Sequence, residues 1–405
     1  MKRRRLLHLC IELPYPPDSG YKIRTSENIA ALSGIAEISS VSFSEETIDP
    51  TRLEEFKNSC GVADVIEPVM HNIHITRKPL KLAGAFINSF TKRIPYVVEK
   101  FRSKKMEKLL IDLLKQGNFD FIIFDQLRMT GYYHPIKQAL GKSPPKFILD
   151  THNVETDLWR QFKEHKRPPS RLLAQLQEDI TKDWELGMIE ALDKTTTISD
   201  LDKSIFIKMG AKPQKLITVP VSMGPSNKLK NIFNPKANKL LLISNLVWEP
   251  NRRGLQWFVD EVFPLVRGEI PDIEFIIVGG GWKFGFQDPI KEMGYVRDTE
   301  PFYSQAAVFI TPLLRGSGVR LKILEAMKRG IPVVSTTIGA SGINVSDGKN
   351  IIIADDAEDF AKGVIELLRN EEYRNEISKN SFEFILKNHT REASRETYKK
   401  ILLGD

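Results

Sequence analysis

Short apolar runs of strand length alternate with helix-length segments along the whole 405-residue chain, and this alternation limits the possible folds more than any other feature. A first series runs from RLLHLCIEL to KLITVPV. After the polar stretch GPSNKLKNIFNPKANK, a second series contains KLLLISNLV, IEFIIVGGG, AAVFITPL and IPVVST. Strands that alternate with helices form a parallel sheet covered on both faces. We therefore predict an α/β protein with two doubly wound, Rossmann-like domains.

The restart of the pattern sets the domain boundaries. We expect an N-terminal domain at residues 1–223, a linker at 224–239, a C-terminal domain at 240–384, and a closing helix at 385–405 that crosses back to the N-terminal domain. Doubly wound sheets bind their ligands at the C-terminal ends of the strands. With two such domains, the expected site is the cleft between them.

The N-terminal stretch MKRRRLLHLCIELPYPP starts with cations and an apolar run, as a signal peptide does. The run is short, however, contains His8 and Glu12, and lacks a small-residue cleavage site, so we interpret it as a first buried strand. No segment approaches the ~18 apolar residues that span a bilayer. Cys10 and Cys60 are too few for a disulfide framework, which favours a cytoplasmic location.

Residues 77–115 carry most of the positive charge. Eleven Lys and Arg stand there against three acidic residues, a segment charge of +8 in a chain whose net charge is +7. The segment also contains Leu, Phe, Ile and Tyr and is expected to include a helix near 97–116. Such a surface is attracted to anionic lipid headgroups, so we favour peripheral contact with a membrane. The alternative is a solvated helix with its apolar face in the core. No nucleic-acid-binding module accompanies the charge, so we expect no nucleic-acid partner.

A loop of the second series, within RGSGVRLKILEAMKRG (315–330), has the composition of a phosphate-binding turn. Gly316, Ser317 and Gly318 allow the backbone to turn sharply and to approach a ligand closely. The next residues begin a helix, whose first amide groups are unpaired donors that favour a phosphate.

The side chains of the same helix admit two interpretations. Arg320 and Lys322 place positive charge beside the turn, and Glu325 can accept hydrogen bonds from a ribose diol. Diphosphate and ribose together are the shared part of nucleotides. Alternatively, Lys322, Glu325 and Arg329 share one helix face and form a solvated, salt-bridged surface.

Two further loops combine cations with a turn at the end of a strand. PYPPDSGYKIRTSENIAAL (14–32) contains Gly20 between a serine and two cations, and NLVWEPNRRGLQWF (245–258) contains Arg252 and Arg253. Arginine forks suit a diphosphate. Each loop alone is equally compatible with a solvated surface loop, but cationic loops in both domains favour a shared anionic ligand.

The stretch GSGVRLKILEAMKRGIPVVST resembles the donor-nucleotide motif of the family 4 retaining glycosyltransferases, which have the GT-B fold. The resemblance continues in PYPPDSGYKIR, ILDTHNVETDLW, TTTISDLD and VWEPNRRGLQWFVDEVFPLV, and it covers nearly the whole chain. It implies a hexosyltransferase-like enzyme (EC 2.4) that moves a sugar from a nucleotide-diphosphate sugar to an acceptor with retained configuration. It also implies no metal, no cofactor, and a carbohydrate or lipid-linked acceptor of polysaccharide or glycolipid biosynthesis.

The resemblance assigns roles to individual residues. Glu325 would hold the ribose hydroxyls, and Lys322 with one of two arginines would neutralise the diphosphate. Backbone in three loops would approach the donor. The substrate-binding residues implied in this way are Gly20, Arg252, Arg253, Val296, Gly316, Ser317, Gly318, Val319, Lys322 and Glu325.

Asp125 and His152, each placed after a predicted strand, are the candidate catalytic residues on the acceptor side. As the bond to phosphate breaks, negative charge grows on the diphosphate and positive charge on the sugar, so fixed polar groups stabilise the transition state. A lone histidine after a strand can also be purely structural.

Three departures from the family pattern affect these roles. Ser317 replaces a glutamate that faces the donor sugar, Ser244–Asn245 replaces a Gly-Arg pair, and Asp125–Gln126 stands where many members carry a histidine. They keep two other functions open. One is a sugar-nucleotide epimerase, and the other is a non-catalytic binding or scaffold protein.

Two other patterns indicate structure rather than chemistry. The Asp200-x-Asp202 pair follows Ser199 at a predicted helix start, where these residue types are favoured as caps. The VGGG run lacks the spacing of a dinucleotide fingerprint. Cysteine and histidine positions show no metal-ligand spacing, so no metal site is expected.

Overall fold

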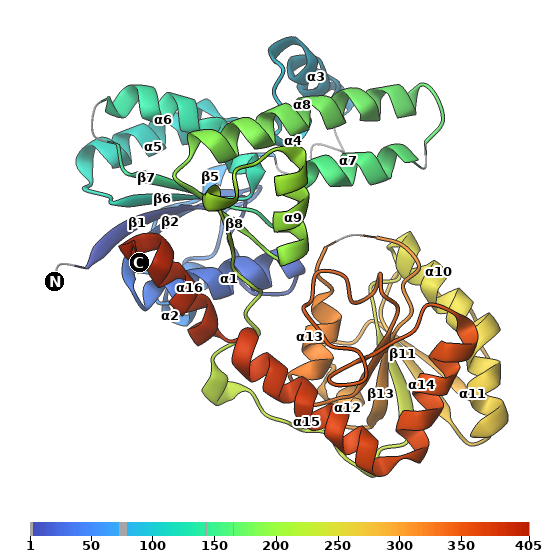
Figure 1. Ribbon diagram of the computed structural model, residues 1–405. Coiled ribbons are helices and arrows are strands. Elements are labelled where there is room, and N and C mark those ends of the chain that lie inside the picture. The colour runs from blue at the N-terminus through green and yellow to red at the C-terminus, as the bar shows by residue number, and fades with distance from the viewer. Residues whose placement is uncertain (1–2, 73–78, 142–143, 165, 317, 405) are drawn as a thin grey trace. The chain divides into compact units, whose positions relative to one another are not determined.

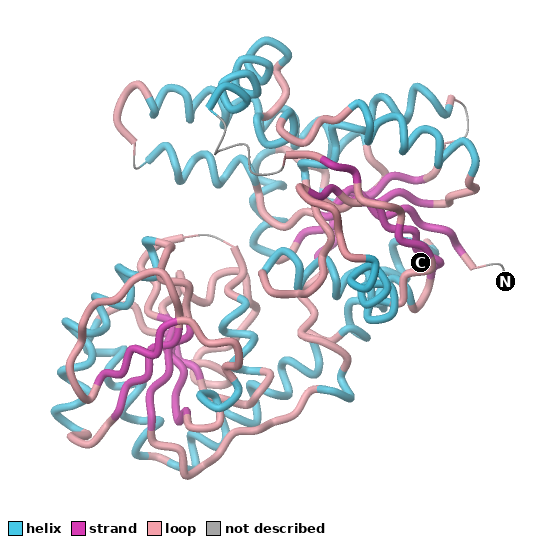
Figure 2. Tube along the Cα trace, turned by 180° about the vertical axis from the view of Figure 1, so that it is seen from behind, coloured by secondary structure: helices cyan, strands magenta, loops and turns pink. Residues whose placement is uncertain are grey.

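The computed structural model of the chain describes residues 3–72, 79–141, 144–164, 166–316 and 318–404. It divides into two compact units. Unit 1 comprises Met1–Ser222 and Arg391–Asp405, and unit 2 comprises Met223–Thr390. Each unit is built on a parallel sheet flanked by helices (Figure 1; Figure 2). The predicted α/β architecture is confirmed in both units.

Unit 1 contains a seven-stranded parallel sheet with the order β4-β2-β1-β6-β7-β8-β9. Its strands are β1 (Arg4–Leu9), β2 (Ala36–Val41), β4 (Asp64–Val65), β6 (Phe121–Asp125), β7 (Lys146–Asp150), β8 (Lys194–Thr197) and β9 (Leu216–Thr218). A separate parallel pair consists of β3 (Phe43–Ser44) and β5 (Val69–Met70).

The central strand β1 shows why helices cover both faces of this sheet. Leu7 and Leu9 belong to one apolar cluster, whereas Leu6 and Cys10 belong to another. Successive side chains of a strand point to opposite faces, so a strand with apolar residues on both faces needs a cover on each side. The sequence-based assignment of this segment as a first buried strand is confirmed.

The helices of unit 1 are α1 (Gly20–Ser33), α2 (Pro50–Cys60), α3 (Pro79–Lys92), α4 (Tyr96–Glu99), α5 (Lys104–Gln116), α6 (Tyr133–Leu140), α7 (Glu155–Glu164), α8 (Ser170–Ala191), α9 (Asp200–Met209) and α16 (Arg391–Leu403). The basic helix expected near 97–116 is divided into α4 and α5. Ser103 separates them and caps α5 by accepting a hydrogen bond from the Met106 amide. The Asp200-x-Asp202 pair is at a capped helix start, as predicted, because the Ser199 hydroxyl accepts from the Asp202 amide at 3.1 Å.

The C-terminal helix α16 packs in unit 1 against α1. The guanidinium of Arg391 pairs with Glu27 at 2.7 Å, and Tyr398 and Ile401 join the apolar cluster beneath α1. The preceding helix α15 ends at Asn388, so the chain returns to unit 1 at Arg391.

Unit 2 contains a six-stranded parallel sheet with the order β12-β11-β10-β13-β14-β15. Its strands are β10 (Lys239–Ile243), β11 (Glu274–Val278), β12 (Ile290–Gly294), β13 (Ala306–Thr311), β14 (Val333–Ser335) and β15 (Ile352–Ile353). Its helices are α10 (Glu249–Trp257), α11 (Phe263–Glu269), α12 (Glu300–Tyr303), α13 (Leu321–Met327), α14 (Ala357–Arg369) and α15 (Glu371–Asn388).

The segment 224–239, expected to be a linker, is grouped with unit 2 and is bonded to it. The amide of Ile232 donates to the Arg329 carbonyl at 3.0 Å, and Arg374 donates to the Pro235 carbonyl at 2.7 Å. Cys10 and Cys60 are free and buried. Among the described residues, no helix combines the length and the apolar content that crossing a bilayer requires.

Candidate active site

The glycine-containing loop of unit 2 lies between β13 and α13. Gly316 and Gly318 have φ values of 119° and 83°, in the region that side chains disfavour. A Cβ on Gly316 would lie 2.5 Å from Nη2 of Arg320 and 2.7 Å from Cη2 of Trp248. Glycine is therefore required here by packing as well as by conformation. Val319 is half-buried in the same loop, and Ser317 lies outside the described residues.

Among the described residues, Lys322 is held by neutral groups only. Its ammonium donates to Ser244 Oγ at 2.6 Å and to Asn251 Oδ1 at 3.0 Å. Burial, together with the nearby charge of Arg320, lowers the pKa of Lys322 to about 7. Ser244, the first residue of the Ser244–Asn245 pair that replaces the family's Gly-Arg, thus positions the lysine.

Arg320 is the second cation of this site. Its guanidinium lies over the Trp248 ring, 5.1 Å from the centroid. Its Nε and Nη2 atoms are shielded from solvent, and neither has a hydrogen-bond partner among the described residues. Burial lowers the pKa of Arg320 to about 10. Two desolvated cations without a carboxylate partner form an environment that an anion would stabilise.

The two arginines of the 245–258 loop have other partners. Nη1 of Arg252 donates to the carbonyls of Leu246 and Val247 at 2.8 and 2.5 Å, so Arg252 fixes the path of its own loop. Arg253 pairs with Glu249 one helical turn away and is largely exposed. The structure thus brings Arg320, rather than either of these, to Lys322.

Glu325 belongs to an ion network on α13. It pairs with Lys328 at 2.9 Å and with Arg329 at 2.6 Å, and Arg329 also pairs with Glu300. Burial raises the pKa of Glu325, but the two cations outweigh burial, so the pKa is lowered overall. The carboxylate is ionised and one quarter exposed, and it keeps the capacity to accept hydrogen bonds from hydroxyls.

The remaining donor-side residues are backbone positions. Val296 is half-buried in the loop that follows β12, two residues after Gly294, whose φ is 68°. In unit 1, Gly20 is exposed and is the first residue of α1, directly after the capping residue Ser19.

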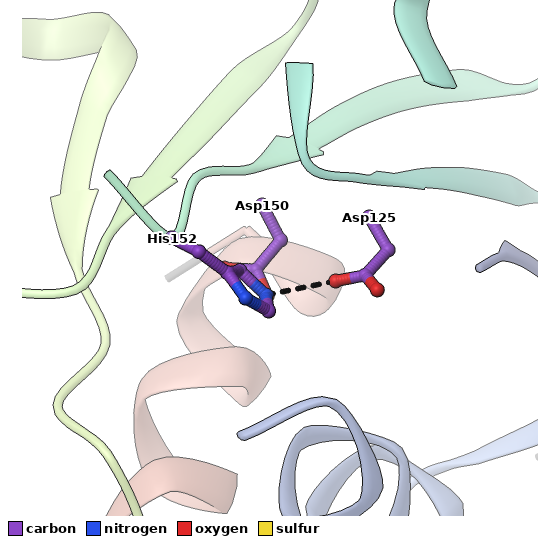
Figure 3. A group of neighbouring side chains, drawn as sticks. All are labelled: Asp125, Asp150 and His152. Carbon is purple, nitrogen blue, oxygen red and sulfur yellow. Dashed lines mark ion pairs between the residues drawn. The ribbon is translucent and has the colours of Figure 1, made fainter. Parts of the chain in front are cut away.

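The second cluster lies in unit 1, at the C-terminal ends of neighbouring strands. Asp125 ends β6, Asp150 ends β7, and the two are register partners in the sheet. His152 follows two residues later and points at both carboxylates (Figure 3). Its Nε2 lies 2.9 Å from Asp125 Oδ1 and 3.5 Å from Asp150 Oδ2. The sheet thus brings together the two predicted catalytic residues and adds a third.

Asp150 is the most strongly anchored of the three. It accepts hydrogen bonds from Arg24 at 2.8 Å, from Asn28 at 2.7 Å and from Thr196 at 2.5 Å. Burial raises its pKa, but Arg24, His152 and the Thr196 hydrogen bond outweigh burial and hold the pKa far below its usual range. The three ligand-type groups are close enough to hold a cation. However, both oxygens of Asp150 are already engaged, which favours an ion-pair network over a metal site.

Asp125 and His152 form a charged pair with incomplete hydrogen bonding. Thr25 donates to Asp125 Oδ2 at 3.0 Å, whereas Asp125 Oδ1 and His152 Nε2 form no well-aligned hydrogen bond despite their proximity. Burial lowers the pKa of His152, but Asp125 outweighs it, so the pKa is raised overall. Asp125 therefore shifts His152 toward its protonated form. The Nε2–H of the imidazole keeps the capacity to donate a hydrogen bond to a ligand.

Two residues that support His152 were not identified from the sequence. Gln126 Nε2 lies 3.1 Å from His152 Nδ1, and Gln126 has φ 73° and ψ 159°, a conformation rare outside glycine. The Tyr21 ring lies 5.5 Å from the His152 ring, and its hydroxyl accepts from the Ile11 amide. Tyr21 is part of the motif PYPPDSGYKIR, in which the sequence analysis singled out Gly20 instead.

Comparison with known proteins relates part of unit 2 to a family of glycosyltransferases. Residues 237–370, which include Arg320, Lys322 and Glu325, match the family model described as "Glycosyl transferases group 1". The chain is 25% identical over 403 residues to an "Uncharacterized 44.6 kDa protein in cps region" of Klebsiella pneumoniae, covering 95% of this chain and 96% of the relative. It is 24% identical to the trehalose synthase of Pyrococcus horikoshii, covering 94% and 96%.

Among solved structures, the Anabaena protein HepE in complex with UDP and glucose superposes with a TM-score of 0.64 at 11% identity, covering 99% of this chain and 100% of HepE. The α/β architecture is therefore that of the GT-B class, as predicted. The similarities thus give the fold of the whole chain and relate residues 237–370 to the glycosyl transferases group 1 model.

Proposed function

We propose that this protein is a retaining, metal-independent glycosyltransferase of family 4 that transfers a sugar from a nucleotide-diphosphate sugar to a hydroxyl acceptor. The observation that carries the proposal is the pair Arg320 and Lys322. Both cations are desolvated, and neither has a carboxylate partner among the described residues. A bound diphosphate supplies the missing negative charge at a backbone turn that only glycine can form.

The chemistry assigned to these cations is stabilisation of the leaving group. Negative charge grows on the diphosphate as the glycosidic bond breaks, and fixed cations in a desolvated site stabilise that charge. Because both side chains are already in place, little reorganisation accompanies the reaction. Glu325, ionised and partly exposed, is assigned to the ribose hydroxyls.

In this proposal the cluster of unit 1 serves the sugar or the acceptor. A protonated His152 donates a hydrogen bond to a substrate hydroxyl, and Asp125 stabilises the charge of the imidazole. Asp150 is assigned a positioning role because its oxygens are already occupied by Arg24, Asn28 and Thr196. Retention of configuration and independence of metal rest on the family resemblance.

The acceptor class follows from the relatives. The Klebsiella pneumoniae protein is described by its place in the cps region, and a further relative is a lipopolysaccharide core biosynthesis glycosyltransferase of Rhizobium meliloti. We infer that the acceptor is a carbohydrate or a lipid-linked sugar in polysaccharide or glycolipid biosynthesis, reached from the cytoplasm. HepE binds UDP, so UDP is the first nucleotide to test.

A thermal-shift titration with UDP, GDP, ADP, CMP and TDP tests the donor site. A nucleotide at 100 times its dissociation constant adds ~2.7 kcal/mol of stability to the folded state. We expect one nucleotide to stabilise the wild type, and Lys322→Ala and Arg320→Ala to lose the effect. Lys362→Ala is the matched control, because Lys362 is an exposed lysine of the same unit that pairs with Asp359. If no nucleotide stabilises the wild type, the non-catalytic scaffold becomes the better interpretation.

Turnover with the identified donor tests the finer claims. We expect donor consumption to continue in the presence of EDTA, and proton NMR of the new glycosidic bond to show the anomeric configuration of the donor. Inversion, or complete inhibition by EDTA that added magnesium restores, would contradict the family 4 assignment. Conversion of the donor without any acceptor would indicate an epimerase instead.

A further inference from the structure

Exposed apolar side chains gather on one part of unit 1, formed by α3, the end of α7 and the start of α8. We call this part the α3–α8 surface, and its exposed large apolar residues are Ile87, Phe162, Leu172, Leu173 and Leu176. Ile87 and Leu172 are 62% and 63% exposed. Figure 1 shows α3 beside the long helix α8. A cluster of apolar side chains on a solvent-exposed face indicates a binding surface.

The helix α3 leaves part of its apolar surface in contact with solvent. Among its described side chains, the buried one is the polar Ser89, whose hydroxyl accepts from Gln177 of α8 at 2.8 Å. The Phe86 ring is half-buried and stacks on Tyr96 of α4, with ring centroids 4.3 Å apart. Ile87 is exposed, so it is the large apolar side chain of α3 that is available to a partner.

The α7–α8 turn adds positive charge next to these apolar residues. Lys166, Arg167 and Arg171 are exposed, and neither arginine has a carboxylate partner within the part of the chain that the structure describes. The ammonium of Lys166 lies 4.7 Å from the centre of the Phe162 ring. Glu164 is the nearest acidic residue, and one carboxylate against three cations leaves the turn with net positive charge.

Other charges of the surface are already neutralised. Arg93, at the end of α3, pairs with Asp183 at 2.8 Å, and Lys163 pairs with Glu178 at 2.5 Å. The uncompensated charge is therefore that of the turn itself. It stands beside Leu172 and Leu173, so cations and apolar groups alternate on one short exposed segment.

We propose that the α3–α8 surface docks the protein on an anionic lipid bilayer, with the leucines of α8 entering the headgroup region and the cations of the α7–α8 turn contacting lipid phosphates. Apolar area and cations together are what interfacial binding requires. A second copy of the chain fits less well, because two cationic turns would be brought together. The inference moves the expected membrane contact from the basic segment 77–115 as a whole to α3 and to the α7–α8 turn.

The inference complements the proposed function but does not depend on catalysis. A membrane-bound transferase meets lipid-linked acceptors in two dimensions, which raises their local concentration. Vesicle binding is measured without donor or acceptor, and nucleotide binding is measured without vesicles. Failure of either one therefore leaves the other intact.

Flotation of the full chain with lipid vesicles tests the proposal. Vesicles of phosphatidylcholine alone are compared with vesicles that also contain phosphatidylglycerol, at low and at high salt. We expect the wild type to float with the anionic vesicles, and Arg167→Gln/Arg171→Gln to lower the partition coefficient about 30-fold. Leu172→Ser/Leu176→Ser should lower it about tenfold or more. The controls Leu265→Ser and Lys379→Gln change an exposed leucine and an exposed lysine of unit 2 and should float like the wild type.

The variants change exposed side chains only, and an unchanged melting temperature and an unchanged nucleotide shift would show that they fold. The proposal is overturned if the wild type ignores anionic vesicles, or if the arginine and leucine variants float as well as the wild type. It is equally overturned if light scattering shows a dimer that Leu172→Ser/Leu176→Ser dissociates, because the surface would then join two copies of the chain.

Discussion

The two charged clusters differ in how their charges are balanced. In unit 1, His152, Asp125, Asp150 and Arg24 neutralise one another within a few ångströms. In unit 2, Lys322 and its neighbouring arginine are desolvated beside neutral partners. A balanced buried network fixes geometry, whereas an unbalanced one favours a ligand of opposite charge. In the proposed function, the first cluster therefore holds His152 in place for the substrate, and the second binds the anionic diphosphate.

The largest expected effect follows from breaking the balance in unit 1. Asp150→Ala leaves the guanidinium of Arg24, which is 1% exposed, buried without its counter-charge. We expect a loss of about 3–5 kcal/mol in the free energy of unfolding, measured by urea denaturation. Asp183→Ala, which removes an exposed ion pair with Arg93, should change stability little. If both substitutions lowered the free energy of unfolding equally, the buried pair of Arg24 and Asp150 would stabilise the protein no more than an exposed ion pair.

Removing the lysine of unit 2 should act on activity instead of stability. Lys322→Met keeps the length of the side chain and removes the charge that the diphosphate needs. We expect a loss of ~3 kcal/mol in transition-state stabilisation, about a 100-fold fall in kcat/KM, from assays of donor consumption. The unfolding free energy should stay the same or rise, because a desolvated ammonium disappears. A strongly destabilised but fully active variant would reverse the assignment.

The pH dependence of nucleotide affinity sharpens the same contrast. The folded-state pKa of Lys322, about 7, lies below the usual lysine value of about 10, so the unfolded chain binds one more proton between these pH values. Stability without ligand should therefore rise with pH across this window. A diphosphate needs the charged lysine, so nucleotide affinity should fall up to about tenfold per pH unit above pH 7.

Calorimetric titrations from about pH 6 to about pH 9, a range that includes the folded-state pKa of Lys322, measure this dependence. Near neutral pH, binding should take up a proton in the wild type. Lys322→Met is the control, because it keeps only the titration of the nucleotide phosphate itself. The same slope in both proteins would mean that Lys322 does not contact the diphosphate.

A smaller effect is expected from the residue that orients Lys322. Asn251→Ala removes one of the two hydrogen-bond acceptors of the ammonium and leaves Ser244 as the other. We expect about a fivefold weaker nucleotide affinity at neutral pH, consistent with ~1 kcal/mol for one hydrogen bond. The midpoint of the pH dependence should move to lower pH. Asn251→Asp, by contrast, supplies a counter-charge to Lys322 and should weaken nucleotide binding more strongly than the alanine variant. The opposite order would contradict the view that the diphosphate supplies the charge that Lys322 lacks.

Local sequence predicted the elements well where the signal lies within a few residues. The apolar run AAVFIT predicted strand β13, Ser199 predicted the start of α9, and Gly316 predicted a tight turn. Local signals also mark where helices stop. Pro168 and Pro169 interrupt the helical hydrogen bonding between α7 and α8.

The sequence by itself determined the two parallel sheets and the candidate loops, because strand and helix periodicity and glycine conformation are local properties. Only the tertiary structure decided the partners of the charges. Arg24 and Asp150 are 126 residues apart in the chain, and Lys322 and Ser244 are 78 apart. Arg320 lies beside Lys322 because it is two residues away in the chain, whereas the positions of Arg252 and Arg253 depend on how β10, α10 and α13 pack. Strand order and helix packing set such distances, and no short stretch of sequence encodes them.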